Sequence, residues 1–89
     1  MIVEFDKSFE KSLNRLNDKS LYPKIQKLLL FIEASKNIQE IPNSKKLTGF
    51  KSYYRVRIGD YRVGFEKINE KTVRLIVIAH RKNIYDKFP

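Results

Sequence analysis

Cysteine is absent from this chain of 89 residues, and histidine occurs only once. The lack of cysteine excludes disulfide bonds, thiolate metal ligands and cysteine nucleophiles, and it fits a reducing cytosol. A structural zinc site is disfavoured because its usual nitrogen and sulfur ligands are missing. The sequence therefore predicts no metal site and no cofactor.

Long hydrophobic runs are also missing. A membrane-spanning helix needs about 20 predominantly apolar residues, whereas the longest apolar runs here are Leu28 to Ile32 and Leu75 to Ala79. The first residues, Met1 to Asp6, are too few and too acidic for a secretory signal. We therefore expect no membrane partner and a cytoplasmic location.

Acidic residues are scarce relative to basic ones, since 19 lysines and arginines face 10 aspartates and glutamates and leave a net charge of +9. A field of this sign attracts polyanions and speeds association with them. RNA, DNA and an acidic protein are the candidate partners, and the alternative is a basic surface without a specific ligand. A chain of this length is expected to form one domain, residues 1–89, around one modest core.

The first part of the chain predicts a strand and two antiparallel helices. Met1 to Phe5 is rich in strand-forming residues. Asp6 or Ser8 can cap a first helix, and Asp18 or Ser20 a second one. Apolar residues recur at helical spacing in both: Phe9, Leu13 and Leu16 in the first, and Leu21, Ile25, Leu28, Leu29 and Ile32 in the second.

The second part predicts a three-stranded antiparallel meander. Residues 37–50 read as a loop, in which Lys45 to Leu47 can form one helical turn. Tyr53 to Ile58 and Tyr61 to Lys67 alternate in polarity around a two-residue turn, Gly59-Asp60. Thr72 to Ala79 is apolar on both faces, which indicates a central strand. With a short C-terminal helix or turn, the order predicts an α+β fold with helices on one face of the sheet.

The two-residue turn fixes the pairing of the first two strands of this meander. Arg57 then lies opposite Arg62, and Arg55 lies opposite Gly64. Directly opposed like charges destabilise a sheet, and local conflicts of this kind mark functional sites. An anionic ligand would relieve the repulsion, and the alternative is a solvated face with counterions. Gly64 leaves a gap in this face, where a backbone could approach closely.

The register of the last strand depends on the loop Asn69 to Lys71. A three-residue loop pairs Phe65 with Leu75 and Val63 with Val77, whereas a two-residue loop reverses the two faces of the strand. The three-residue form is preferred here. It places four residues of the last strand on the arginine face, with the last of them near the arginine pair: Arg74, Ile76, Ile78 and His80.

Three stretches resemble the RelE/ParE superfamily of toxins. Residues 80–85, His-Arg-Lys-Asn-Ile-Tyr, resemble the His-Arg-x-x-x-Tyr ending of these toxins. Residues 54–62 resemble their strand pair, Tyr-x-(Leu/Ile/Val)-(Arg/Lys)-x-Gly-x-Tyr-Arg, and residues 46–49 match the Lys-Leu-x-Gly that often precedes it. The order of elements agrees with the family over nearly the whole chain.

The resemblance implies a helix hairpin on an antiparallel sheet and a toxin that an antitoxin holds inactive, the antitoxin being acidic and encoded by the adjacent gene. RelE-type members cleave messenger RNA without a metal, usually in the ribosomal A site, whereas ParE-type members inhibit DNA gyrase. By position, Arg55 and Arg57 match a basic pair of RelE-type enzymes, Arg62 the arginine after the strand tyrosine, and Arg81 and Tyr85 the ending. RelE-type members can carry lysines at the basic pair, one of them acting as a base. Arginine stays protonated, so this departure leaves the base unassigned.

Metal-free RNA cleavage by attack of the ribose 2′-hydroxyl on the phosphate needs a proton acceptor, a proton donor and groups that neutralise the phosphorane oxygens. Arginine suits the last task because it presents two parallel donors and keeps its charge. We assign this task to Arg57, Arg62 and Arg81, with Arg55 as a helper that contacts RNA.

Proton transfer points to a different set of residues. His80 is the one side chain whose unperturbed pKa is near neutrality, so it is the candidate general base or acid. The alternative is that His80 only caps or packs. Tyr85 can orient the 2′-hydroxyl or stack on a base, or it can pack the tail onto the sheet, which Phe88 is also expected to do.

Further basic residues could hold RNA by its phosphates. They are Lys7, Lys11 and Arg15 on the first helix and Lys82 in the tail, and the alternative is an ordinary solvated surface. The leading hypothesis is a messenger-RNA-cleaving endoribonuclease that acts on the ribosome, because the basic set on the sheet is complete. A gyrase inhibitor and a non-catalytic RNA-binding module are the alternatives.

Overall fold

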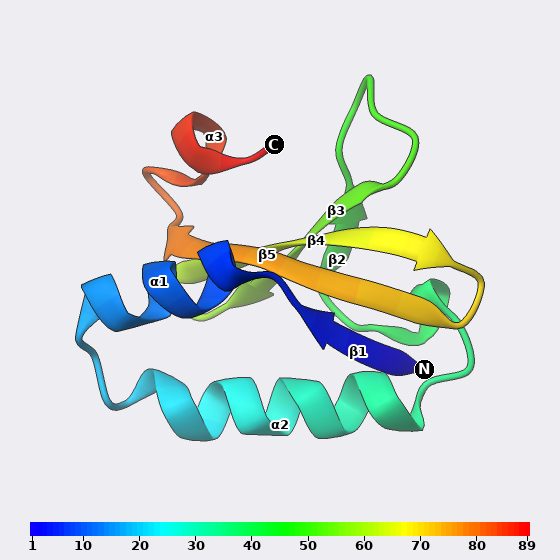
Figure 1. Ribbon diagram of the computed structural model, residues 1–89, viewed down its shortest axis with the longest axis horizontal. Helices are drawn as coiled ribbons and strands as arrows, with labels where there is room; N and C mark the ends of the chain where they lie inside the picture. Colours follow the sequence, from blue (N-terminus) through cyan, green and yellow to red (C-terminus); the bar gives the residue numbers. More distant parts are fainter.

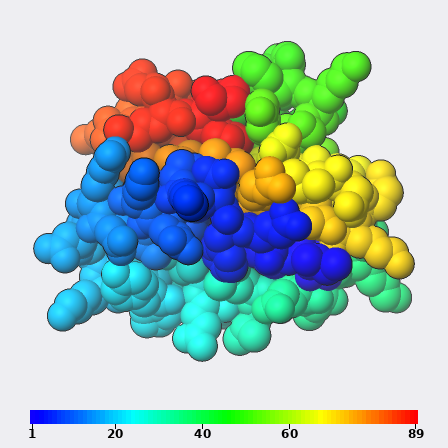
Figure 2. Space-filling view, viewed as in Figure 1, coloured from blue at the N-terminus to red at the C-terminus, as the bar shows by residue number.

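The computed structural model describes residues 1–89 and places a five-stranded sheet between two unequal layers (Figure 1). Helices α1 (Lys7–Leu16) and α2 (Leu21–Ala34) cover one face, and the short helix α3 (Ile84–Lys87) lies on the opposite face. The space-filling view shows the C-terminal tail and the loop after β2 side by side on that second face (Figure 2). The predicted α+β class, the helix hairpin and the C-terminal helix are thereby confirmed.

The sheet has the strand order β1-β5-β4-β3-β2. Its centre is the predicted antiparallel meander of β3 (Tyr53–Ile58), β4 (Tyr61–Asn69) and β5 (Thr72–His80). The edges are β1 (Ile2–Phe5), which pairs parallel to β5, and β2 (Ser44–Lys46), which pairs antiparallel to β3.

Strand β2 corrects the expectation of a helical turn over Lys45 to Leu47. A 3₁₀ turn (Ile38–Glu40) precedes it, and Asn43 reverses the chain with a φ of 60°. The carbonyl of Asn43 then accepts from the N–H of Arg57 at 3.1 Å, and the N–H of Leu47 donates to Tyr53 at 2.9 Å. Pairing with β3 satisfies these backbone groups and overrides the weak local preference of two lysines.

A short side chain caps the start of α1, whereas the side-chain cap predicted for α2 is not formed. Asp6 caps α1, as predicted, by accepting from the N–H of Ser8 at 3.0 Å. Asp18 accepts from the N–H of Ser20 at 3.0 Å in the turn before α2. Neither helix, nor α3, has the length and apolar character required to cross a membrane.

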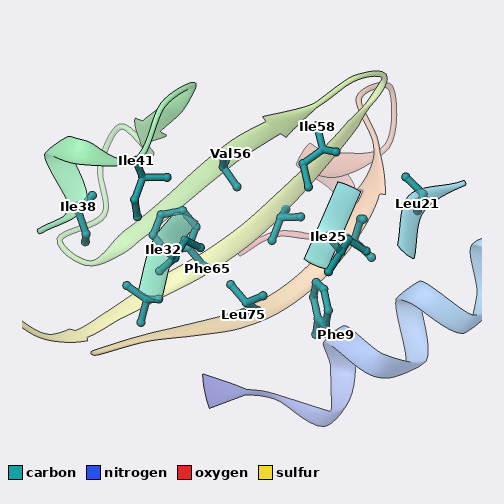
Figure 3. Packing of buried hydrophobic residues seen from close by; sticks show 13 residues of the cluster. Phe9, Leu21, Ile25, Ile32, Ile38, Ile41, Val56, Ile58, Phe65 and Leu75 are labelled. Atoms are coloured by element: carbon teal, nitrogen blue, oxygen red, sulfur yellow. The ribbon is translucent and has the colours of Figure 1, made fainter. Parts of the chain in front are cut away.

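The main hydrophobic core lies between the helix hairpin and the sheet (Figure 3). Phe9 from α1 and Ile25 and Ile32 from α2 are buried against inward-facing residues of the central strands. Those strand residues are Val56, Ile58, Val63, Phe65, Val73, Leu75 and Ile78. This confirms that the alternating apolar residues of β3 and β4 face the helices.

A smaller core lies on the opposite face and fixes the C-terminal tail. It consists of Val77, Ala79, Ile84 and Phe88, all buried. The ring of Phe88 fills the gap over Gly64, where an added Cβ would approach the ring to 2.6 Å. The expectation that Gly64 leaves an open gap for a backbone is therefore wrong, because the Phe88 ring closes it. Phe88 is the packing anchor that the sequence indicated.

Two irregularities set the register of β5. The connecting loop has two residues, Glu70 and Lys71, rather than the expected three, but β4 carries one extra residue, Ile68. The two differences compensate, so the predicted pairing of Phe65 with Leu75 is confirmed.

Beyond that pair, the expected register is wrong. A second extra residue, Ile76, lies in β5, so Val63 pairs with Ile78 instead of Val77. A β-bulge of this kind shifts the following residues to the opposite face. Ile78 therefore joins the helix-facing core instead of the arginine face, and His80 pairs with Tyr61.

Candidate nucleic-acid interface

The β3–β4 hairpin builds the candidate site with the register expected from its turn. Arg57 pairs with Arg62, and Arg55 pairs with Gly64. The neighbours of these arginines in the strands point into the helix-facing core, so the arginines point to the other face. Strand β2 adds Lys45 directly beside Arg55.

Arg81 joins these side chains from the end of β5. Its backbone N–H donates to the carbonyl of Asp60 at 2.8 Å, which fixes the chain beside the hairpin turn. Its charge acts on Arg62 together with those of Arg55 and Arg57. The four residues Arg55, Arg57, Arg62 and Arg81 form what we call the arginine patch.

The arginine patch carries no ion pair with the protein's own carboxylates. The two salt bridges of the molecule lie elsewhere, between Lys67 and Glu70 at 2.9 Å and between Arg74 and Glu4 at 3.0 Å. Positive charge is therefore left available for an external anion.

Arg62 is the most constrained member of the arginine patch. Its Nη1 donates to the carbonyls of Gly59 at 3.0 Å and Tyr61 at 2.9 Å, which orients the guanidinium. Partial burial lowers the pKa of Arg62 below the usual value of arginine, and the charges of the other three arginines lower it further, with a smaller opposing effect from Asp60. A bound anion would offset both effects, because an opposite charge favours the positively charged form of Arg62.

The patch borders a hollow of about 310 Å³ that has no hydrophobic lining residue. We call it the cationic hollow, and its lining residues are Asn43, Ser44, Lys45, Arg55, Arg57 and Arg62. Nη2 of Arg57 lies 3.5 Å from Oδ1 of Asn43, the outer limit of a hydrogen bond, so this guanidinium keeps most of its donors free. Such a hollow suits a phosphate group, which guanidinium groups bind with paired hydrogen bonds.

Tyr85 lies at the margin of the patch. The guanidinium of Arg55 is 5.0 Å from the centre of the Tyr85 ring, a cation–π contact. The Tyr85 side chain is 68% exposed, whereas Ile84 and Phe88 are buried and hold the tail in place. The structure thus leaves Tyr85 free to contact a ligand.

His80 does not lie on the arginine patch, and the expectation that it would is wrong. The extra residue Ile76 shifts the alternation of β5, so that Ala79, not His80, pairs with Arg62. The His80 ring lies edge-on to Tyr61 at 5.7 Å, and its Nδ1 accepts from the N–H of Lys82 at 3.2 Å. These contacts match the alternative interpretation, in which the histidine packs and caps a turn.

The basic residues of α1 lie apart from the arginine patch. Lys11 and Arg15 line a separate hollow of about 370 Å³ between α1 and the end of β5, together with His80. Lys7 and Lys82 are exposed. Lys11 and Arg15 therefore do not line the same hollow as the arginines of the patch.

Lys45 and Asn43 are residues of this surface that the sequence reasoning missed. They were hidden because the segment around them was expected to be a loop or a helical turn. The available signal was Pro42-Asn43 followed by Ser-Lys-Lys, which can start an edge strand after a turn.

Nowhere in the structure do three or more acidic or histidine side chains gather where they could share a metal ion.

The fold and the arginine patch together define a small α+β protein that presents an unneutralised cationic sheet face to a polyanion. A sequence model described as "ParE toxin of type II toxin-antitoxin system, parDE" matches residues 3–85. Toxin RelE3 of Methanocaldococcus jannaschii is 34% identical over 90 residues, and the match covers 100% of both chains. The chain therefore belongs to the RelE/ParE superfamily of toxins from type II toxin–antitoxin systems, as its motifs indicated.

Solved structures agree with this assignment. The toxin chain of the RelB-RelE antitoxin-toxin complex from Methanococcus jannaschii is 32% identical with a TM-score of 0.78, and the match covers 97% of this chain and 99% of that one. For the archaeal RelE-RelB complex from Pyrococcus horikoshii OT3 the identity is 26%, the TM-score is 0.71, and the coverage is 93% and 97%.

Proposed function

We propose that this toxin is a metal-independent endoribonuclease that cleaves messenger RNA on the ribosome. The observation that carries the proposal is the arginine patch: the guanidinium groups of Arg55, Arg57 and Arg62 line one outward hollow, the charge of Arg81 acts on Arg62, and no carboxylate is paired to any of them. Its side chains suit an RNA phosphate, because a row of unpaired arginines destabilises the free sheet and is neutralised by such a ligand.

In the proposed reaction, the ribose 2′-hydroxyl attacks the adjacent phosphorus and the bond to the 5′-oxygen of the next nucleotide breaks. The products are a 2′,3′-cyclic phosphate and a 5′-hydroxyl. Arg57, Arg62 and Arg81 neutralise the phosphorane oxygens, and Arg55 holds the neighbouring backbone. Charge positioned in advance for the transition state is often the largest single contribution to catalysis.

Proton transfer is assigned to the ionisable side chains beside the arginine patch. His80 points to the other face of the sheet, so it has no part in this step. Tyr85 borders the patch through Arg55, and Lys45 lines the cationic hollow. We assign the two proton transfers to this pair: one member, acting in its deprotonated form, accepts the 2′-hydroxyl proton, and the other, acting in its protonated form, donates a proton to the leaving 5′-oxygen.

A cognate antitoxin is the proposed protein partner. One similar solved structure is a RelB-RelE antitoxin-toxin complex, and another is an archaeal RelE-RelB complex. A net charge of +9 favours an acidic antitoxin, which a short acidic reading frame beside the gene would supply.

The proposed substrate places the protein in the cytoplasm, where messenger RNA is translated. We include Lys7, Lys11, Arg15 and Lys82 as contacts to ribosomal RNA away from the cleavage site.

Inhibition of DNA gyrase is the second candidate function. It is favoured by the match to a family described as ParE toxin. The full-length similarity to a protein named RelE3 and the complete set of patch arginines favour RNA cleavage.

One experiment separates the two candidates. The toxin is induced in cells, messenger RNA ends are mapped, and plasmid supercoiling is measured in parallel. RNA cleavage predicts new ends in phase with codons and unchanged supercoiling. Gyrase inhibition predicts altered supercoiling or DNA breaks with intact messages, and that result would overturn the proposal.

Variants then test the residues. Arg62→Ala and Arg81→Ala should abolish toxicity while the proteins remain folded by circular dichroism. Arg74→Ala is the matched control, because Arg74 lies on β5 and is already engaged with Glu4. Full toxicity of both patch variants would leave the site assignment wrong.

A further inference from the structure

A second hollow, of about 360 Å³, opens beside the arginine patch. It lies between the loop after β2 and the C-terminal tail, which neighbour each other on the same face of the sheet (Figure 2). Leu47, Phe50, Tyr85 and Phe88 are among its lining residues, so we call it the aromatic hollow. Its lining contrasts with that of the cationic hollow, which has no hydrophobic residue.

Phe50 is a lining residue of the aromatic hollow that neither hydrophobic core includes. Its ring is 43% exposed, and it belongs to neither buried cluster. The ring centre lies 5.6 Å from that of Tyr53, and Tyr53 lies edge-on to Phe88 at 5.2 Å. This chain of rings holds Phe50 at the rim of the hollow without burying it, so part of its surface stays open to a ligand.

The two hollows are adjacent, because Lys45 and Arg55 line both. The cationic hollow offers only polar and cationic groups, whereas the aromatic hollow adds aromatic rings and the Thr48 hydroxyl to the basic side chains at its border. A nucleotide has the same two halves, a charged phosphate and a flat base whose faces stack and whose edge forms hydrogen bonds. Aromatic side chains beside a basic groove are the general means of holding single-stranded nucleic acid.

We infer that the aromatic hollow is a nucleobase subsite, in which Phe50 stacks on an unpaired base adjacent to the phosphate held by the arginine patch. The inference rests on the proposed function and assigns it a further binding residue. The ligand class is single-stranded RNA with a splayed base. Arg55 joins the subsites, since its guanidinium faces Tyr85 and lines both hollows.

Binding to a short single-stranded oligonucleotide tests the subsite without requiring catalysis. The probe is a fluorescent 2′-deoxy tetranucleotide, which lacks the attacking hydroxyl and so cannot be cleaved by the proposed reaction. A set of the same probe with one abasic position locates the base that enters the hollow. Phe50→Leu should weaken binding about 5- to 150-fold, the effect of one base stacked on an aromatic ring. Phe50→Tyr should bind nearly as well as the wild type.

The abasic probes make the test specific. At one abasic position, the affinity of the wild-type protein should fall by a factor similar to that expected for Phe50→Leu. The affinity of the Phe50→Leu protein should not change when the base at that position is removed. Phe31→Ala is the matched control, because Phe31 is an aromatic residue of similar exposure, 47%, on α2. This variant should bind as the wild type does.

The outcomes separate the subsite from the patch. If Arg62→Ala loses binding while Phe50→Leu keeps it, the subsite is refuted and the patch stands. The subsite would also be refuted if, at every abasic position, the loss of affinity caused by Phe50→Leu and the loss caused by the missing base simply multiplied, as independent effects do. If the wild-type protein does not bind the probe, or Arg62→Ala binds as tightly as the wild type, phosphate binding at the patch fails and the subsite fails with it.

Discussion

The contact between Gly64 and Phe88 supports a quantitative prediction about how the C-terminal tail is held. A Cβ on residue 64 would lie 2.6 Å from Cγ and Cδ2 of Phe88 and 2.9 Å from Cδ1. Real Cβ atoms do not tolerate such distances, so Gly64→Ala must move either the strand or the ring. Overpacking of this kind costs about 1–3 kcal/mol, and each kcal/mol lowers the melting temperature of a domain of this size by about 4–8 °C.

A double-mutant cycle isolates this clash from other effects. Phe88 is 3% exposed, so Phe88→Ala alone should cost about 3–5 kcal/mol. In that background the alanine at position 64 meets no ring, so Gly64→Ala should be nearly neutral or stabilising by up to about 1 kcal/mol. The expected coupling energy is therefore about 1–4 kcal/mol.

The assay is urea denaturation of the four proteins, followed by circular dichroism. Additive effects of the two substitutions would refute the close packing of Phe88 on Gly64. They would also refute the account of how the tail, and with it Tyr85, is placed beside the arginine patch.

Three further predictions concern stability. Ser12→Ala should lower the free energy of unfolding by about 1–3 kcal/mol in urea denaturation, because the N–H of Ile78 donates to the Ser12 hydroxyl at 3.0 Å; unchanged stability would contradict this contact. Arg57→Gln should raise the free energy of unfolding by about 0.2–1 kcal/mol at low ionic strength, because it relieves the repulsion between residue 57 and Arg62. This gain should vanish near 1 M salt, where the screening length is about 3 Å. A loss of stability at both salt concentrations would count against the repulsion. The hydrogen bonds that the Asp18 carboxylate accepts lower its pKa from 3.8, so its contribution is complete above the unfolded pKa and is lost as pH falls through the lower folded pKa. Asp18→Asn should flatten the acid limb of stability against pH below about pH 4 in urea titrations, and an unaltered limb would show that another group dominates it.

The elements with strong local signals could be predicted from the sequence. The turn Gly59-Asp60 lies between two alternating strands, so one register satisfies both the turn and the burial of the apolar residues. That is why the pairing of Arg57 with Arg62 followed from the sequence and is confirmed. The Asp6 cap of α1 is likewise a local interaction between neighbours.

The features that the sequence predicted wrongly depend on contacts between segments that are distant in the chain. Ile76 is accommodated as an extra residue in β5, and nothing in an apolar run of this strand marks which residue will bulge. That one extra residue moves the side chain of His80 to the opposite face of the sheet. Strand β2 is three residues long and forms only because β3 provides partners for its backbone groups, so Lys45 was missed as part of the site.

The most direct test of the central claim is cleavage of a ribosome-bound messenger RNA by the purified toxin. The account predicts one cut that leaves a 2′,3′-cyclic phosphate. It also predicts that the cut is lost when the nucleotide 5′ to it lacks its 2′-hydroxyl, and lost again with Arg62→Ala. Cutting that persists on the 2′-deoxy message, or in the Arg62→Ala protein at the wild-type rate, would contradict RNA cleavage at the arginine patch.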